Sequence, residues 1–399
     1  MGLFDRSLSY GGRLLRGSTL RDRLRSFFGR GSEHRELLEE ADVRIGVSGI
    51  RGKSSTAKQL GGILADRGYD TYTKITGDHP TSYHNGRKIP IQRRGPRVTL
   101  YENLNLVREF LPQLAITSHD DAVVMENQAI TEYTMRMVNE QFLRPDLLVF
   151  CNVRQDHNDT LGKRRQTIAR SFARSVPEGC HVISGEQHGV IHEYLESEIT
   201  ARGGTIEQVD VPDRHRDLIG SETIHALNHV LGYLDEPPLP DSELQSMLDA
   251  IQPEWTELPG GRVFNAAKVN EIESTELFRR QLVGTGDDAE PVCPFVFLRR
   301  DRRGRTASFV QYVDILAERG LIDRVHLGGA YTGVFARRVD VPATEHDTDE
   351  AAAGDVLDRL LGTEQPVMFM ANTVHPFMRD LADEVTERER GGPAPLPEY

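Results

Sequence analysis

The stretch Val47–Thr56, VSGIRGKSST, links an apolar run to a helical one through two glycines and a lysine. The residues that lead into it, VRIGVSG, are typical of a buried strand, and STAKQLGGILADRG after it predicts a helix that stops at a glycine. Glycines let backbone N–H groups approach phosphate oxygens, and the helix start adds partial positive charge. The stretch therefore predicts a phosphate-binding loop.

The spacing of this loop differs from the commonest pattern, G-x-x-x-x-G-K-[ST]. That pattern would place its first glycine where Val47 stands, whereas the glycines here are Gly49 and Gly52. Lys53 would reach the β- and γ-phosphates, and the Ser54 hydroxyl would bind Mg²⁺. Only six of the 48 basic residues are lysine, which draws attention to Lys53. We interpret the loop as a shorter variant with a different lineage.

The composition of the chain narrows the function classes. Its 399 residues suit two or three domains, and 38% hydrophobic content is typical of a globular protein. A net charge of -13 argues against nucleic acid as a general partner. The sequence contains no run of 18 apolar residues, so it predicts no membrane-spanning helix. The well-separated Cys151, Cys180 and Cys293 fit no metal spacing and indicate buried, reduced thiols in a cytoplasmic protein.

The N-terminal segment is basic, unlike the acidic remainder of the chain. Residues 1–31 hold seven arginines and two aspartates, with leucines and phenylalanines at helical spacing. This pattern predicts either a basic amphipathic helix on an anionic membrane surface or an arm packed on the protein's own acidic surface. We expect residues 1–40 to form this arm, and the protein to lie peripherally on the inner face of the cell membrane.

Strand and helix patterns alternate from residue 42 onward. The runs DAVVMEN, DLLVFCNV and CHVISGE predict strands separated by helices, so we expect an α/β fold with a parallel sheet. The punctuation in PEWTELPGGRVF predicts a boundary near residue 260, after which PFVFLRRD, RVHLGG and PVMFMAN restart the rhythm. The predicted units are a central ATP-binding domain, a smaller C-terminal α/β domain and a disordered tail, at 41–260, 261–390 and 391–399.

Polar residues follow two of the predicted strands. Glu126 lies where a parallel strand ends, at the edge that also carries the phosphate loop, so it is either a Mg²⁺ ligand or a surface acid. The segment CNVRQDHNDTLG gathers Asn152, Asp156, His157 and Asp159 behind another strand. These side chains can bind a metal, or they can form a polar loop with an Asx turn.

In this order, the motifs resemble the Mur ligase superfamily of ATP-dependent amide-bond ligases, and within it the branch that makes poly-γ-glutamate capsule. The similar pieces are SGIRGKSS, KITG, NVRQDHNDTLG, AAKVNEIEST and LRRDRRGRTASF, and the resemblance as a whole covers about residue 42 to about residue 380. The resemblance implies a P-loop central domain with a parallel sheet and a smaller Rossmann-like domain. It also implies an ADP-forming ligase that elongates a γ-linked glutamate polymer through an acyl phosphate.

The resemblance further implies cofactors and site residues. The cofactors would be ATP and Mg²⁺, with two ions. Catalytic roles would fall on Lys53, His157 and Arg305, and metal binding on Ser54, Glu126 and His157. Nucleotide contacts would come from Gly49, Ile50, Arg51, Gly52, Lys53, Ser54, Ser55, Asn152, Asn265, Asn270 and Asp301.

The implied partners are glutamate, the polyglutamate chain and membrane-embedded synthase subunits, with a homo-oligomer as an option and no nucleic acid. Arginine-rich runs in NGRKIPIQRRGPR and RRDRRGR suit a polyanionic chain, although each residue could equally be a solvated surface arginine. The chain departs from the family in TIARSFARS, which lacks the lysine that many Mur ligases carbamylate, and in Asn270-Glu271 where the family has Asn-Asp. Two alternatives stay open: a Mur-type ligase for another amino acid or acceptor, and a P-loop NTPase that serves as scaffold of a membrane complex.

Overall fold

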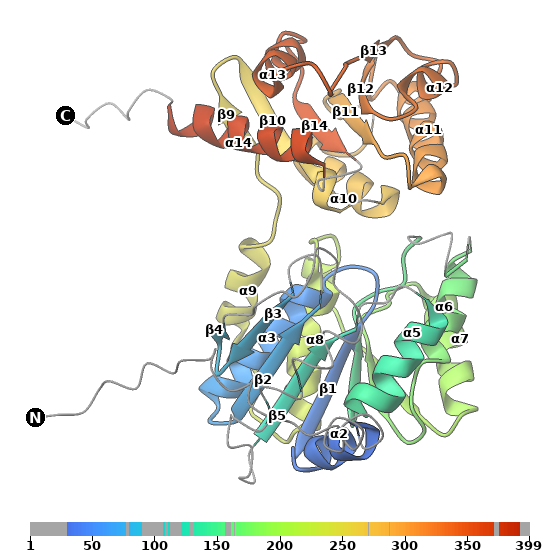
Figure 1. Ribbon diagram of the computed structural model, residues 1–399, viewed down its shortest axis with the longest axis vertical. Helices are drawn as coiled ribbons and strands as arrows, with labels where there is room; N and C mark the ends of the chain where they lie inside the picture. Colours follow the sequence, from blue (N-terminus) through green and yellow to red (C-terminus); the bar gives the residue numbers. More distant parts are fainter. Residues whose placement is uncertain are drawn as a thin grey trace, which may run out of the picture.

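The computed structural model describes residues 30–76, 80–89, 107, 111, 121–127, 131–155, 161–162, 164–269, 271–286, 288–370 and 375–391. These residues form two α/β domains, each built on its own sheet (Figure 1). Of the expected arm at residues 1–40, residues 1–29 lie outside the described residues, as does most of the expected tail, whereas Arg30–Glu39 form helix α2. In the described part of the chain, no helix is long and apolar enough to cross a membrane.

The larger domain is organised around a sheet with the strand order β4-β3-β2-β5-β1-β6-β7-β8. Its strands run parallel except at the β2–β3–β4 edge, where the pairing is antiparallel. Strand β1 lies between β5 and β6, which places the residue pairs Val47–Glu126 and Ser48–Phe150 side by side. The strands are β1 (Val43–Ser48), β2 (Asp70–Ile75), β3 (Thr81–His84), β4 (Arg87–Ile89), β5 (Asp121–Glu126), β6 (Leu147–Phe150), β7 (His181–Ser184) and β8 (Thr205–Gln208).

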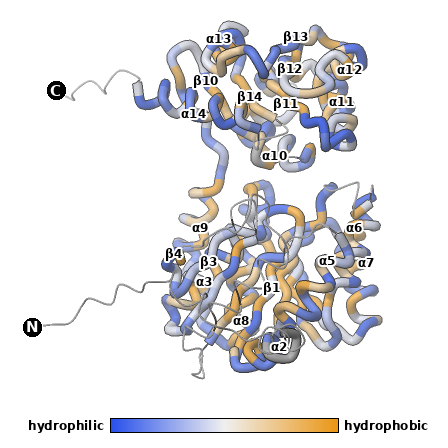
Figure 2. The backbone as a smooth tube through the Cα atoms, in the orientation of Figure 1, coloured by the Kyte–Doolittle hydropathy of each residue, from blue (hydrophilic) through white to orange (hydrophobic). Residues whose placement is uncertain are grey.

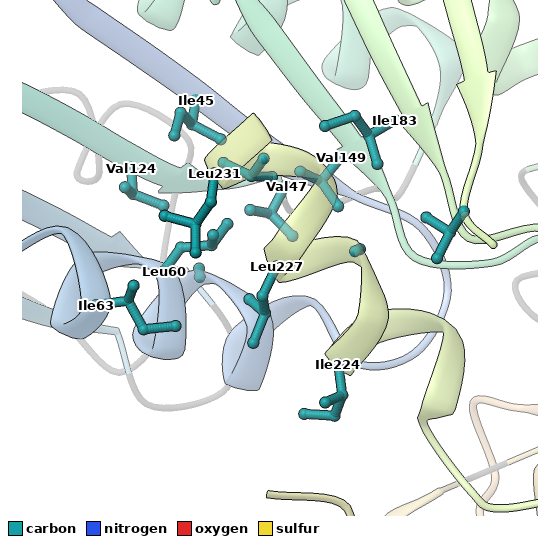
Figure 3. Close-up of a cluster of buried hydrophobic side chains, with 14 of the residues drawn as sticks. Ile45, Val47, Leu60, Ile63, Val124, Val149, Ile183, Ile224, Leu227 and Leu231 are labelled. Atoms are coloured by element: carbon teal, nitrogen blue, oxygen red, sulfur yellow. The ribbon is translucent and has the colours of Figure 1, made fainter. Parts of the chain in front are cut away.

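Helices cover both faces of this sheet because successive strand residues point to opposite sides. In β6, Leu147 and Val149 pack with helices α3 and α8, whereas Leu148 and Phe150 pack with α6 and α7. Figure 3 shows the first of these clusters between β1, α3 and α8. The helices are α2 (Arg30–Glu39), α3 (Lys53–Asp66), α5 (Glu132–Met137), α6 (Arg165–Ala173), α7 (Gly189–Thr200), α8 (Ser221–Tyr233) and α9 (Asp241–Asp249), with short helical turns η2 (Val138–Leu143) and η3 (Asp213–His215).

The smaller domain has a six-stranded sheet in the order β13-β12-β11-β14-β10-β9, parallel except for β9. Hydrophobic clusters lie on both of its faces. The elements are β9 (Thr256–Leu258), β10 (Gly261–Asn265), η4 (Ala266–Lys268), α10 (Ile272–Val283), β11 (Cys293–Leu298), α11 (Arg303–Glu318), β12 (Val325–Gly329), α12 (Thr332–Ala336), β13 (Ala343–Glu345), α13 (Ala353–Leu361), β14 (Val367–Met370) and α14 (Pro376–Arg390).

These two sheets confirm the expected α/β class with parallel-rich sheets. The expected boundary near residue 260 falls in the turn between β9 and β10, so β9 already belongs to the second sheet. Figure 2 shows hydrophobic residues concentrated along inner elements such as β1 and α8, whereas α14 is mostly hydrophilic. Each domain thus has its own core.

The arrangement of the domains brings two polar edges toward each other. Helix α10, which follows β10, lies on the side of the smaller domain that faces the larger one (Figure 1). Arg154, just beyond the carboxyl end of β6, donates to Ser274 Oγ in α10 at 2.5 Å. Because parallel strands end at one edge, the carboxyl ends of both sheets meet at this junction.

Candidate functional site

The phosphate-loop candidate connects β1 to α3 at the junction edge of the larger sheet. Gly49 and Gly52 have φ angles of 126° and 86°, a region that side-chain-bearing residues rarely adopt. A Cβ atom on Gly49 would also lie 3.0 Å from both Cβ and the backbone nitrogen of Cys151. Both glycines are therefore required by the turn itself, as a close-fitting anion loop demands.

The lysine of the loop folds back over it. Lys53 Nζ donates to the carbonyl oxygens of Gly49 and Ile50 at 2.9 and 3.0 Å. Ser55 Oγ donates to the Gly52 carbonyl at 2.8 Å and so supports the start of α3. The ammonium group thus lies directly beside the loop, where it can meet phosphate oxygens at the N-terminus of a 14-residue helix.

Ser54 and Glu126 form the candidate metal pair. Ser54 Oγ donates to Glu126 Oε1 at 3.0 Å, and the backbone N–H of Thr76 donates to Oε2 at 2.9 Å. Glu126 is only 3% exposed, so its carboxylate is held in one orientation. A hydroxyl and a carboxylate this close are hard oxygen ligands that fit Mg²⁺, which takes its remaining ligands from water and phosphate. Among the described residues, no group of three or more histidine, cysteine or acidic side chains could hold a metal.

Asn152 holds the loop from the next strand. The Arg51 N–H donates to Asn152 Oδ1 at 3.0 Å, and the Ile50 N–H donates to the Asn152 carbonyl at 3.2 Å. Its side-chain amide donates to Glu222 Oε1 at 3.0 Å. The described contacts of Asn152 therefore hold the phosphate loop in position from behind.

Two buried carboxylates that the sequence did not single out support this edge. Glu186 accepts from the backbone N–H groups of Val153 and His188 at 2.7 and 2.9 Å. Glu222, in the first turn of α8, accepts from Asn152 and from Arg154, the latter at 3.3 Å. The first turn of a helix is a common place for acids, so Glu222 carried no distinctive signal.

The predicted residues of the smaller domain lie at the carboxyl ends of its strands. Asn265 ends β10, and its Oδ1 accepts from the Ala267 N–H at 3.2 Å. Asp301 follows β11 and forms a two-pronged ion pair with Arg299, which holds the pKa of that carboxyl below its usual value. Arg305 lies in the first turn of α11. The contact of the phosphate loop with the smaller domain is between Arg51 and Glu271, at 3.7 Å. The predicted His157 and Asn270 lie outside the described residues.

The three cysteines are buried free thiols, as expected. Cys151 packs behind the phosphate loop, and burial raises the pKa of its thiol to about 12. A thiol protonated at neutral pH is a poor nucleophile. Cys151 therefore acts here as a small packing residue.

Residues 256–388 match the family model described as the poly-gamma-glutamate synthase CapB C-terminal domain. Over 379 residues the chain is 21% identical to PGA synthase CapB of Bacillus subtilis (strain 168), covering 89% of this chain and 93% of that protein. The likeness therefore extends across both domains.

Solved structures share the whole fold. E. coli FolC in complex with ADP has a TM-score of 0.61 at 16% identity and covers 90% of this chain and 93% of its own. A bifunctional folylpolyglutamate synthase/dihydrofolate synthase with Mn, AMPPNP and L-glutamate bound has a TM-score of 0.55 at 17% identity, with coverages of 90% and 92%. MurF from Acinetobacter baumannii has a TM-score of 0.55 at 14% identity, with coverages of 89% and 79%. The chain therefore shares the fold of these solved proteins, and its residues 256–388 match the family of the poly-gamma-glutamate synthase CapB C-terminal domain.

Proposed function

We propose that this chain is an ATP-dependent amide-bond ligase that elongates a γ-linked glutamate polymer. The observation that carries the proposal is the site at the edge of the larger sheet, with Lys53 on the glycine loop and Ser54 against Glu126. The similarity to PGA synthase CapB along 89% of the chain supports the same activity. A phosphate loop alone would suit many nucleotide-binding proteins, so the similarity decides between them.

The residues of the loop define how nucleotide would be held. The backbone N–H groups in the first turn of α3 and the Lys53 ammonium would bind the phosphates, and Ser54 with Glu126 would bind Mg²⁺. ATP supplies the γ-phosphoryl group that turns a carboxylate into an acyl phosphate, whose acyl carbon an amine attacks as inorganic phosphate leaves. Lys53 would oppose the negative charge that gathers between triphosphate and carboxylate.

Residues of the smaller domain would complete the site. Arg305 and Asp301 would meet the γ-phosphate side, and Asn265 with Asn270 the nucleoside side. Both domains present α/β edges to one junction (Figure 1), so closure of the smaller domain would bring these side chains toward one nucleotide. The Mn bound with AMPPNP in the folylpolyglutamate synthase structure supports a divalent metal beside the nucleotide. A second Mg²⁺ held by His157 is a further part of the proposal.

The proposed partners are glutamate, the growing polyglutamate chain and membrane-embedded synthase subunits. L-Glutamate is bound in the folylpolyglutamate synthase structure, which supports glutamate as the incoming amino acid. The exposed Arg87 and Lys88 of β4 provide positive charge beside the larger sheet. Such charges suit a polyanionic substrate.

Glutamate-dependent release of ADP tests the proposal directly. We expect the purified protein, alone or with membrane partners, to release ADP from ATP and Mg²⁺ only when glutamate and an acceptor are present. A panel of other amino acids separates this ligase from a Mur-type ligase of different specificity. ATP hydrolysis that no amino acid changes would leave a scaffold NTPase as the better description.

Glu126→Gln tests the metal site in the same assay. The amide cannot offer the negative oxygen that Mg²⁺ prefers, so we expect at least tenfold more Mg²⁺ to be needed for half-maximal activity. Glu132→Gln, a partly exposed acid in α5, is the control and should leave the requirement unchanged. An unchanged requirement in Glu126→Gln would argue against Glu126 as a ligand.

Peripheral membrane attachment through residues 1–31 is a separate proposal, supported by the arginine-rich composition of that segment. We expect the full chain, but not a chain lacking residues 1–31, to float with vesicles that contain anionic lipid. Equal flotation of both proteins would reject the segment as an anchor.

A further inference from the structure

Three arginines of the larger domain reach across the junction to the start of α10. Arg51 belongs to the phosphate loop, Arg154 follows β6, and Arg165 begins α6. Arg154 donates to Ser274, and Arg165 Nη2 donates to Glu273 Oε1 at 2.7 Å. Together with Arg51, these contacts join the short segment at residues 271–274 to three separate parts of the larger domain.

Arg51 makes the contact that involves the phosphate loop itself. Its Nε lies 3.7 Å from Glu271 Oε1. The backbone N–H of the same residue is fixed by Asn152, so the loop and the ion pair are joined within one residue. A shift of the guanidinium toward an anion on the loop would separate it from Glu271.

The two acidic residues of this segment are in different environments. The Glu271 side chain is 2% exposed, whereas that of Glu273 is 38% exposed. Burial raises the pKa of Glu271, and the charges of Arg51 and Arg154 oppose that rise. A buried carboxylate is costly unless cations and hydrogen bonds compensate it, whereas an exposed ion pair contributes little. Glu271 is therefore the acid for which the arginine contact matters.

Glu271 also begins the helix that carries it. Its carboxylate accepts from the backbone N–H of Ser274 at 2.9 and 3.0 Å, and its carbonyl accepts from Thr275 Oγ1 at 2.7 Å. The same side chain thus caps α10 and faces the phosphate loop. A change in the ion pair of Glu271 therefore also alters its hydrogen bonds to the first turn of α10.

We propose that Glu271 is a positioning residue that holds Arg51 of the phosphate loop against the smaller domain, and that nucleotide phosphate takes its place when nucleotide binds. The inference rests on the proposed function only for nucleotide binding at the loop. It links the phosphate site to domain docking, because the anion that attracts Arg51 releases one of three bridges to α10. By reciprocity, breaking this bridge in advance strengthens nucleotide binding.

A double-mutant cycle on MgADP binding, measured by titration calorimetry, tests the exchange without requiring turnover. Gln at position 271 can still accept from the Ser274 N–H but has no charge, so we expect Glu271→Gln to lower the Kd for MgADP at least threefold. Arg51→Gln should raise the Kd, and the double variant should match Arg51→Gln. An effect of Glu271→Gln that persists undiminished without Arg51, or no effect at all, would overturn the proposal.

Two further variants separate charge from helix capping. Glu271→Asp keeps both a carboxylate and a capping oxygen, so its Kd should stay within twofold of the wild type. Glu273→Gln removes the exposed acid at the same helix start and should also stay within twofold. If Glu271→Asp binds MgADP as Glu271→Gln does, charge is not the cause and the proposal fails.

Hydrogen exchange of α10 supplies a second test that holds even if Glu271→Gln does not fold. We expect MgADP to raise amide exchange in residues 272–283 at least twofold in the wild type and to leave it unchanged in Arg51→Gln. No rise in the wild type, or the same rise in both proteins, would overturn the exchange. These readouts stand apart from ligase activity, so an absence of glutamate-dependent ADP release would sink the proposed function and leave the positioning role intact.

Discussion

The two sheet edges that meet at the junction are built differently. On the larger sheet, Glu126 and Asn152 are buried and held by hydrogen bonds from other strands and loops. On the smaller sheet, Asp301 is exposed and paired with a neighbour two residues away. The larger edge is thus preorganised for an anion and a cation, whereas the smaller edge presents charges whose effect depends on where the domain docks.

Lys53 gives the strongest test of the preorganised edge. Lys53→Ala removes the ammonium that lies on the Gly49 and Ile50 carbonyls, so we expect glutamate-dependent ADP release to fall by about a hundredfold or more. Thermal unfolding should show an intact fold, because Lys53 is partly exposed at a helix start. Activity of Lys53→Ala close to that of the wild type would show that the edge of the larger sheet is not preorganised for catalysis.

Arg305 tests the edge of the smaller domain. If this residue acts only when the domain is docked, Arg305→Ala should lower kcat about tenfold to a hundredfold while MgADP affinity stays unchanged. Arg319→Ala, at the opposite end of α11, is the matched control and should behave as wild type. A loss of MgADP affinity equal to the loss of kcat would mean that Arg305 already contacts nucleotide in the undocked protein.

A pair of glycine substitutions measures how firmly the loop is shaped. Gly49→Ala places a Cβ at a φ of 126° and 3.0 Å from Cys151, and should lower the free energy of unfolding by about 2 kcal/mol. Gly62→Ala, inside α3 with open space around it, should raise that free energy by about 0.5–1 kcal/mol. Urea unfolding checks both, and a neutral Gly49→Ala would show that the loop is not preorganised.

Acid should weaken the smaller domain through a buried histidine pair. His326 Nδ1 lies 2.9 Å from His346 Nε2, and burial lowers the pKa of His326 to about 4, with His346 acting in the same direction. The unfolded chain keeps a pKa near 6.5, so it binds more protons than the folded state between these values. The free energy of unfolding should be constant above about pH 6.5 and fall by about 1–3 kcal/mol as the pH drops toward 4.

The fluorescence of Trp255 follows this transition, because the one tryptophan of the chain packs in the smaller domain. His326→Asn should flatten the pH dependence between 6.5 and 4. A pH dependence of the same size in that variant would assign the effect to other groups.

Part of the site could be predicted from the sequence, because some of its polar residues directly follow the apolar runs that predict strands. Glu126 and Asn152 were found as polar residues directly after apolar runs, and both lie beside the phosphate loop. Thr76, Glu186 and Glu222 were given no role, although Thr76 lies in the quoted piece KITG and Glu186 ends the quoted run CHVISGE. Their roles depend on which elements pack together, and local pattern does not encode that.

The hairpin of β3 and β4 was also missed, although a signal was present. Asn85 and Gly86 both adopt positive φ, which is the turn that an Asn-Gly pair favours between two antiparallel strands. The alternation of hydrophobic residues around it is short, so the βα rhythm of the rest of the chain dominated the prediction. A search for two-residue turns would have found it.

Each described sheet is assembled from one continuous part of the chain, with β1–β8 in the first and β9–β14 in the second. The backbone therefore passes between the domains once, in the segment between α9 and β9. A break there would leave every described strand with its partners, and two separately produced halves would meet only through junction contacts such as those of α10. The chain is in this sense a natural candidate for split-protein complementation, in which activity would rise with the concentration of the added half.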